Sequence, residues 1–223
     1  MQSTQLLQTL QSVFGFDSLR QGQQPVIESV MNGYSAAAIF PTGSGKSLCY
    51  QLPATMLPNL TLVISPLLAL MKDQLSFLQS KGIAAASIDS SQSREEAQRV
   101  MVGVKNGEIK ILMISVERLK NERFREFIRQ VPISLMVVDE AHCISEWGHN
   151  FRPDYLKLPQ YQRALNIPQV LLLTATATQA VIKDMQDKFA IAPQHVTITG
   201  FYRPNLDLCV SPCREENKGE ALL

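Results

Sequence analysis

The stretch Phe40-Pro-Thr-Gly-Ser-Gly-Lys-Ser47 decides the fold of this 223-residue chain. Gly43 and Gly45 have no Cβ, so the backbone around them can curl and turn successive N–H groups into one concavity. Residues 35–40, which lead into the glycine-rich turn, form a short apolar run that is typical of a buried strand. Residues 47–52, which follow Lys46, have a helical pattern. A strand, a glycine-rich turn and a helix in this order predict a loop that holds phosphate groups.

The side chains of this loop indicate a nucleoside triphosphate, and the helix behind it would add the positive end of its dipole. Lys46 can reach the phosphate oxygens, and the hydroxyl of Ser47 is a candidate magnesium ligand. The backbone N–H groups that would hold the phosphates belong to Thr42, Gly43, Ser44 and Gly45. The general pattern has glycine at the position of Phe40, whereas the Pro-Thr-Gly-Ser-Gly-Lys form is typical of helicase-like ATPases. The alternative is a glycine-rich turn with a solvated lysine.

An acidic motif, Asp139-Glu-Ala-His142, follows the apolar run Leu135–Val138. Four apolar residues that end in two carboxylates predict a buried parallel strand whose carboxyl end carries Asp139 and Glu140. Parallel α/β sheets bind ligands at that end of their strands. We therefore expect Asp139 to hold magnesium and Glu140 to orient and deprotonate an attacking water. Alone, the motif could equally be a strand that ends in two solvated acids.

Composition sets broad limits on the function. An apolar fraction of 45% allows a sizeable core, and a formal net charge of +1 gives no global basic field for nucleic acid. Neither a signal peptide nor a run of membrane-spanning length is recognisable, so we expect no membrane association. The four cysteines are scattered; Cys209 and Cys213 could be half of a zinc site, although unpaired thiols are the better interpretation. We expect a reducing intracellular compartment, either a bacterial cytoplasm, with nucleoid association, or a nucleus.

Apolar runs and helical patterns alternate along the chain. Seven runs predict strands: Ala36–Phe40, Leu60–Ser65, Ala84–Ile88, Ile109–Ser115, Leu135–Val138, Val170–Leu173 and Val196–Thr199. Helical patterns include Gln5–Val13, Gly22–Met31, a helix after the loop that ends at Pro53, Leu67–Gln79, Arg94–Lys105 and Ala177–Phe189. This alternation predicts an α/β fold with a mostly parallel central sheet and helices on both faces.

Five segments occur in an order that closely resembles the first motor lobe of RecQ-family ATP-dependent DNA helicases of superfamily two. The segments are Leu10–Gln23 with its Phe14-Gly15 and Leu19-Arg20 pairs, Ser65–Gln74, Ser115–Leu119, Asp139–Tyr155 and Thr174–Ala177. The most specific of them is the aromatic-rich part, Cys143–Tyr155, where Trp147, Phe151 and Tyr155 stand among charged and polar residues, a mixture that suits a mobile surface element that stacks on exposed bases. The resemblance implies a RecA-like three-layer sandwich. It implies a helicase ATP-binding lobe over residues 1–206, including adenine-recognition helices, and a linker or tail over residues 207–223 toward a second lobe.

The resemblance also implies a role for each matching residue. Phe16, Arg20 and Gln23 would contact adenine, although a core aromatic and a solvated helix are the plain alternatives. The catalytic set would be Lys46, Asp139, Glu140 and His142. Contacts to nucleic acid, and the coupling of hydrolysis to movement, would come from Ser65, Pro66, Trp147, His149, Phe151, Arg152, Thr174 and Thr176. The alternatives here are helix caps at Ser65 and Ser115, a hydroxyl-capped turn at the threonines, and a loop whose aromatics fill a satellite core.

The expected function is the motor lobe of an ATP-dependent 3′-to-5′ DNA helicase with ATP and Mg²⁺ as cofactors. Hydrolysis would be coupled to translocation on single-stranded DNA and to unwinding in repair and recombination. The partners would be single-stranded DNA, tailed duplex DNA and a second RecA-like lobe, which normally supplies arginine fingers. Two alternatives stay open, an RNA helicase lobe and a non-catalytic nucleotide-dependent binding module. An isolated lobe should be nearly inactive on its own.

Overall fold

A seven-stranded sheet forms the centre of the computed structural model, which describes residues 2–148 and 150–200. Its strand order is β3-β4-β2-β5-β6-β1-β7, and all of the pairings are parallel. The strands are β1 (Ala36–Ile39), β2 (Leu60–Ile64), β3 (Ala85–Ile88), β4 (Ile111–Ile114), β5 (Ile133–Val138), β6 (Val170–Thr174) and β7 (Val196–Ile198). Each of the seven predicted strands is therefore confirmed, and the sheet is parallel throughout.

The central strands are buried on both faces, as their unbroken apolar runs require. In β1, Ala36 and Ala38 point to one core, while Ala37 and Ile39 point to the other. The other inner strands alternate in the same way. Two hydrophobic cores therefore form, one on each face of the sheet.

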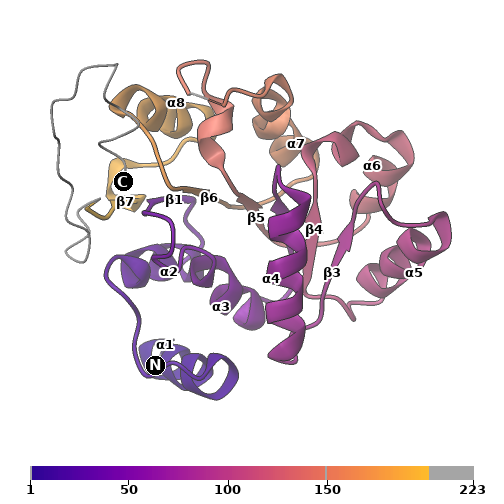
Figure 1. The fold of residues 1–223 in the computed structure, drawn as a ribbon, viewed down its shortest axis with the longest axis horizontal. Coiled ribbons are helices and arrows are strands. Elements are labelled where there is room, and N and C mark those ends of the chain that lie inside the picture. Colours follow the sequence, from indigo (N-terminus) through magenta and orange to yellow (C-terminus); the bar gives the residue numbers. More distant parts are fainter. Residues whose placement is uncertain (1, 149, 201–223) are drawn as a thin grey trace, which may run out of the picture.

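Helices cover both faces and complete the three layers (Figure 1). One core packs under α5 (Arg94–Lys105), α6 (Glu122–Ile128), α7 (Leu158–Ala164) and α8 (Gln179–Phe189). The opposite core packs under α1 (Gln2–Thr9), α2 (Gln23–Met31), α3 (Leu48–Met56) and α4 (Leu68–Ser80). This arrangement confirms the predicted sandwich.

Local signals explain where several helices begin. At the start of α5, the Glu96 N–H donates to the Ser93 hydroxyl and the Ser93 N–H donates to the Glu96 carboxylate, which is a capping box. At α8, the Thr178 hydroxyl accepts from the Val181 N–H. Both helices start at or within two residues of the predicted positions.

Two predicted helix boundaries are wrong. The helix after the phosphate loop does not end at Pro53: α3 continues to Met56, and the Leu57 N–H donates to the Pro53 carbonyl at 2.8 Å. Residues 48–54 are all buried, so tertiary packing outweighs the one hydrogen bond that proline removes. At the N-terminus, α1 ends at Thr9 and passes into a π-helical turn, Leu10–Phe14, which Gly15 closes at φ 75°.

The carboxyl ends of the strands bring the sequence motifs to one edge of the sheet. Across that edge, β2 leads to Ser65, β5 to Asp139, β6 ends at Thr174, and β1 leads to the phosphate loop. These four strands are consecutive neighbours in the sheet. The fold thus collects residues that are far apart in sequence, as the parallel topology requires.

Candidate active site

The phosphate loop turns through two glycines in the left-handed region, Gly43 at φ 83° and Gly45 at φ 84°. The Lys46 ammonium donates to the carbonyl oxygens of Phe40 and Pro41 at 3.0 and 3.4 Å, so the lysine lies back over its own loop. The Ser44 hydroxyl also donates to the Pro41 carbonyl, at 2.6 Å. A lysine that is hydrogen-bonded to neutral carbonyls can exchange them for an anion, which offers a stronger charge-assisted bond.

Ser47 occupies the N-cap of α3, yet its side chain makes no capping hydrogen bond. A serine at this position usually accepts from the first turn of the helix. Since the hydroxyl is not used in that way, it is available as an oxygen ligand beside the positive end of the helix.

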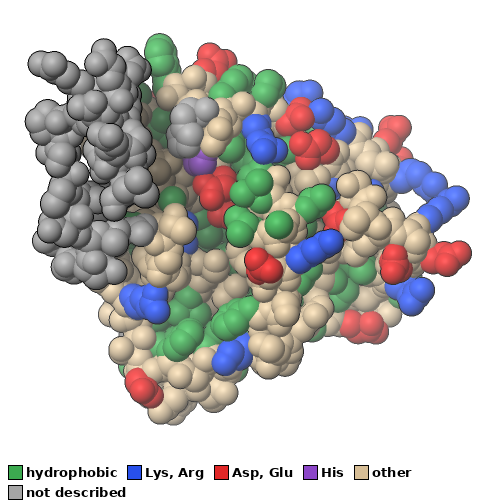
Figure 2. Space-filling view, in the orientation of Figure 1, with side chains coloured by type: hydrophobic (Ala, Val, Ile, Leu, Met, Phe, Trp, Pro, Cys, Tyr) green, Lys and Arg blue, Asp and Glu red, His purple; other side chains and the backbone are tan. Residues whose placement is uncertain are grey.

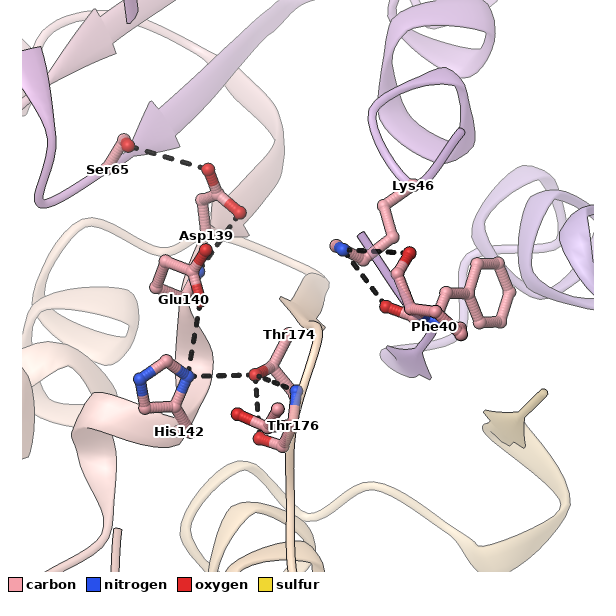
Figure 3. A network of polar contacts seen from close by, with 9 residues as sticks. Phe40, Lys46, Ser65, Asp139, Glu140, His142, Thr174 and Thr176 are labelled. Atoms are coloured by element: carbon pink, nitrogen blue, oxygen red, sulfur yellow. Dashed lines mark hydrogen bonds and ion pairs between the residues drawn. The ribbon is translucent and has the colours of Figure 1, made fainter. Parts of the chain in front are cut away.

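Asp139 is buried at the end of β5 and connects two strands. One carboxylate oxygen accepts from the Ser65 hydroxyl at 3.5 Å, and the other accepts from the Glu140 N–H at 3.0 Å. Burial, and then the charge of Glu140, raise the pKa of Asp139 to about 6. The charge of Lys46 partly opposes this rise in the pKa of Asp139. The pKa of Lys46 itself is lowered by burial, although the charges of Glu140 and Asp139 act to raise it. The lysine and the two acids therefore lie within one another's fields (Figure 3).

Glu140 has a backbone that non-glycine residues rarely adopt, with φ 50° and ψ 45°. Such strain costs on the order of 1–3 kcal/mol and persists only where its surroundings enforce it. Here the preceding strand and the following 3₁₀ turn, Ala141–Ile144, set the direction of the chain. The Glu140 carboxylate lies 3.3 Å from His142 Nδ1.

His142 joins the acidic motif to β6. Its Nδ1 lies 2.9 Å from the Thr174 hydroxyl oxygen, and that hydroxyl donates to the Thr176 carbonyl at 2.9 Å. Because the Thr174 hydrogen is used there, Thr174 must accept from His142, so Nδ1 carries a proton. Hydrogen bonds with Cys143, and then with Glu140, raise the pKa of His142 to about 9. The Glu140–His142–Thr174–Thr176 chain is drawn in Figure 3.

The three predicted adenine-recognition residues line one hollow beside the loop, and two of them, Arg20 and Gln23, already make hydrogen bonds there. Phe16 is exposed, while the Arg20 guanidinium donates to the Gly43 carbonyl at 2.9 Å. Gln23 is buried; its amide nitrogen donates to the Gly45 carbonyl at 2.9 Å and its oxygen accepts from the Arg20 N–H at 2.7 Å. Arg20 and Gln23 therefore brace the phosphate loop in this structure.

The aromatic-rich loop divides into exposed and buried parts. Trp147 is 76% exposed and Phe151 is half-buried, whereas Tyr155 is fully buried in the core. The expectation that all three aromatics belong to a surface element is therefore wrong for Tyr155. Arg152 is half-buried, and its N–H donates to the Cys143 carbonyl at 3.1 Å. His149 lies outside the described residues, as do the boundary at residue 206, the expected tail and the cysteines at 209 and 213.

The loop contacts the acidic motif through Gly148. A Cβ at this position would lie 2.4 Å from the His142 carbonyl oxygen, so no larger residue fits without movement. The Gly148 N–H donates to the Ser145 carbonyl at 2.9 Å. The sequence does not reveal this contact, although a glycine inside an aromatic-rich segment is a signal of close backbone approach.

The two proposed helix caps are absent. The Ser65 side chain faces Asp139, and the N-cap of α4 is Leu67, which provides no side-chain cap. Ser115 likewise makes no capping bond in front of the 3₁₀ turn Val116–Lys120. The capped-turn interpretation does hold at the threonines, since the Thr176 N–H donates to the Thr174 hydroxyl at 3.3 Å.

Comparison with known proteins places this geometry in a family. Residues 20–185 match the family model described as DEAD/DEAH box helicase. The chain therefore belongs to the DEAD/DEAH box helicase family, and membership implies nucleotide binding.

Relatives with specific names support the RecQ resemblance. The chain is 46% identical over 208 residues to a Bacillus subtilis protein named "Probable ATP-dependent DNA helicase RecS", covering 93% of this chain and 42% of that protein. It is 42% identical over 200 residues to the Haemophilus influenzae "ATP-dependent DNA helicase RecQ", covering 90% of this chain and 32% of that protein. The predicted resemblance to RecQ helicases is confirmed, and the chain spans less than half the length of these two relatives.

A solved structure supports the fold. The "hypothetical ATP-dependent RNA helicase from Sulfolobus tokodaii" superposes with a TM-score of 0.66 at 20% identity, over 88% of this chain and 57% of that chain. At this identity the likeness concerns the architecture. In the part of the chain that the structure describes, no helix is both long and apolar enough to span a membrane. Cys49 and Cys143 are buried free thiols.

The first prediction concerns the contact at Gly148. Gly148→Ala should lower the free energy of unfolding by about 1–3 kcal/mol, because the new methyl group must displace the His142 carbonyl. It should also shift the NMR resonances of the His142 ring. Gly200→Ala is the matched control, since a Cβ there meets nothing within 4 Å. A Gly148→Ala variant with unchanged stability and His142 resonances would show that the loop does not pack on the acidic motif.

The second prediction concerns the buried charge of Asp139. Its pKa is raised from 3.8 to about 6, so above pH 6 the folded state carries the cost of a buried carboxylate, and below pH 4 this cost disappears. In the absence of magnesium, Asp139→Asn should therefore stabilise the protein at pH 7.5 by on the order of 1–3 kcal/mol, with the gain fading toward pH 4. Chemical denaturation at both pH values measures the difference.

Asp184 supplies a control of opposite sign. Burial raises the pKa of Asp184, but the hydrogen bonds from Lys188 and Ser145 lower it by a larger amount. The pKa of Asp184 therefore lies below its usual value. Asp184→Asn should destabilise the protein at pH 7.5, and the loss should fade as the pH falls. If Asp139→Asn also destabilised the protein at pH 7.5, the charged Asp139 carboxylate would stabilise the folded state, which contradicts the predicted cost of its burial.

Proposed function

We propose that this chain is the nucleotide-binding motor lobe of an ATP-dependent 3′-to-5′ DNA helicase of RecQ type. In the whole protein, hydrolysis would drive translocation on single-stranded DNA and unwinding of tailed duplexes in repair and recombination. The observation that carries the proposal is that Lys46, Asp139 and Glu140 lie at one edge of the sheet, near enough for the two acids to raise the pKa of Lys46. The names of the RecS and RecQ relatives support DNA as the nucleic acid.

The loop and the acidic motif suit ATP with Mg²⁺. Magnesium prefers oxygen ligands and is commonly held by one or two carboxylates together with substrate phosphates. Asp139, whose buried charge has a raised pKa, and Ser47, whose hydroxyl makes no cap, are the residues that would hold it. When bound, the cation would neutralise charge on the phosphates. Lys46 would leave the Phe40 and Pro41 carbonyls for the phosphate oxygens.

Glu140 would orient the attacking water and accept its proton. Its strained backbone aims the carboxylate to one side of Asp139, and His142 contacts it at 3.3 Å. His142 would hold the carboxylate in place, with its own ring fixed by Thr174. Thr174 and Thr176 would carry movement between this site and α8, since the turn that they form leads into that helix.

Nucleic acid would contact the neighbouring part of the same edge. Ser65 and Pro66 follow β2 directly, and Trp147, Phe151 and Arg152 belong to a loop that packs on the acidic motif. Exposed aromatics can stack on bases without reading sequence. Ordering of Trp147 by a base would act on His142 through Gly148, which touches the His142 carbonyl. His149 is included in this proposal on the resemblance alone.

A second RecA-like lobe would complete the site. Three leucines at the start of α4, Leu67, Leu68 and Leu70, are between 37% and 43% exposed, beside Ser65 and Asp139. Figure 2 shows hydrophobic side chains over the region of α4, among charged side chains of both signs. An apolar surface next to the acidic site supports coverage by another lobe. Arginine fingers from such a lobe are typically worth about 10³–10⁵ in rate, so this chain alone should hydrolyse ATP very slowly.

The test of the proposal is the replacement of Lys46. Lys46→Ala should weaken MgATP binding by about 10- to 100-fold, because a charge-assisted contact to the phosphates is lost. Lys110→Ala is a matched control, since Lys110 also donates to two successive carbonyls, those of Leu57 and Pro58, but lies at the opposite end of the sheet. Isothermal titration calorimetry measures both variants. Equal ATP affinity in wild type and Lys46→Ala would show that the triphosphate does not bind at this loop.

A further inference from the structure

A groove of about 670 Å³ lies between α5 and α6, beside the end strand β3 of the sheet (Figure 1). From α5 it is lined by residues that recur every three or four positions and so share one helix face: Arg94, Ala97, Gln98, Met101, Val102 and Lys105. From α6 it is lined by Arg123, Phe124, Glu126 and Phe127. These two helix faces lie outside the motifs of the nucleotide site.

The floor of the groove is apolar. Phe124 is buried and Phe127 is half-buried, with their ring centroids 6.0 Å apart. From α5, Met101 is half-buried and Val102 is 48% exposed. Met101 and Phe127 also pack against the core under these helices, so the floor is firmly supported. An apolar group that entered the groove would release water from this floor, and the methionine side chain can adapt to its shape.

The rim of the groove is basic. Arg94, Lys105 and Arg123 are exposed, and among the described residues none of the three forms an ion pair. Arg118 closes one end; it is half-buried and uses one of its donors for the Asp89 carbonyl, at 3.1 Å. Exposed cations without an acidic neighbour are available to the carboxylates of another molecule.

Two acidic residues line the groove with these four basic ones, and only one of the two is exposed. Asp89 is buried, and its carboxylate accepts from the Ser87 hydroxyl at 3.1 Å and from the N–H and hydroxyl of Ser91 at 2.8 and 2.5 Å. The charge of Asp89 is thus bound within its own turn, and Glu126 is the exposed acid. The groove therefore has a basic excess, although the net charge of the whole chain is only +1.

The dimensions of the groove favour an extended segment. The 12 residues of α5, from Arg94 to Lys105, give a length of about 17 Å. The volume divided by this length gives a mean cross-section of about 40 Å². A helix with its side chains is about 10 Å wide and has roughly twice that cross-section, whereas about five extended residues span the same length.

Nucleic acid fits this groove less well than a peptide does. The groove starts at Asp89, near the carboxyl ends of the strands, and runs to Lys105 and Gln130, which precede β4 and β5 at the opposite edge. A strand of DNA that crosses the active-site edge would not follow this direction. Bases stack on exposed aromatic rings, but the apolar side chain that is exposed in this groove, Val102, is aliphatic.

We propose that the groove between α5 and α6 binds a partner protein through an extended acidic segment with an apolar residue at its centre. The central residue would lie on Met101 and Val102. Carboxylates before and after it would pair with Arg94 and Arg123, which lie at the start of the two helices, and with Lys105 at the far end. Burial of the apolar residue supplies affinity, while the charges at the rim supply specificity and speed of association. This interaction is separate from nucleotide binding and goes beyond the motor function.

The test uses a capped six-residue peptide with two acidic residues at each end and leucine and phenylalanine in the centre. Methyl NMR of the methionines detects its binding, since Met101 lines the groove, whereas Met31 and Met56 line a separate hollow. We expect a saturable shift of the Met101 methyl resonance, with a Kd of about 0.1–1 mM, while the other two resonances stay in place.

Charge variants test the rim. Arg94→Glu combined with Arg123→Glu should weaken peptide binding about tenfold, because two attractive pairs become repulsive. Glu126→Arg should strengthen it about threefold, since it removes the exposed acid of the groove. Arg129→Glu is the matched control, because it reverses an exposed arginine just beyond α6 that does not line the groove.

Hexathymidylate, titrated in the same way, represents single-stranded DNA, and thermal unfolding confirms that each variant is folded. If hexathymidylate shifts the Met101 resonance and the peptide does not, the groove takes nucleic acid and the proposal is refuted. An unmoved Met101 resonance at about 5 mM peptide, several times the largest expected Kd, refutes it as well, and so does equal peptide affinity in wild type and the double variant. None of these readouts involves ATP or Lys46, so the proposed function is tested independently.

Discussion

The carboxylate of Asp139 is the group on which the arrangement of this molecule depends. It ends the buried strand β5, receives the Ser65 hydroxyl from β2 and the Glu140 N–H from its own chain, and lies in the field of Lys46 from the loop after β1. Parallel strands deliver these groups to one edge, and burial at that edge raises the pKa of Asp139. A buried carboxylate with a raised pKa stores free energy that a bound cation would release.

Strain and close packing continue outward from this carboxylate. Glu140 adopts a left-handed backbone, His142 carries a proton on Nδ1 for Thr174, and Gly148 touches the His142 carbonyl. The contact at Gly148 leaves no room for a larger side chain, and the hydrogen bond to Thr174 fixes the orientation of the His142 ring. Such features cost stability and are concentrated at functional sites, where they hold groups in place before a ligand arrives. The contacts also form an unbroken path from the acidic motif to the exposed Trp147.

Local patterns in the sequence were sufficient to predict the fold and to point to the two motifs that meet at one edge of the sheet. Each of the seven strands overlaps a predicted apolar run, because strands buried on both faces are largely apolar and six of the seven are buried in this way, and the loop and the acidic motif are each contiguous. Prediction failed where packing outweighs local preference: α3 passes through Pro53, and Tyr155 is buried in the core. It also missed the contacts that join distant segments, such as Ser65 with Asp139, Gly148 with His142 and Tyr50 with Gln74. No periodicity or spacing specifies such pairs, since only the folded topology brings them together.

The most direct test of this account is a crystal structure of the chain with Mg²⁺ and a non-hydrolysable ATP analogue. We expect the Lys46 ammonium to leave the carbonyls of Phe40 and Pro41 for phosphate oxygens, with the metal between Ser47 and Asp139. The adenine ring should lie in the hollow between Phe16 and α4. A triphosphate bound elsewhere, with Lys46 still on the two carbonyls, would contradict the account.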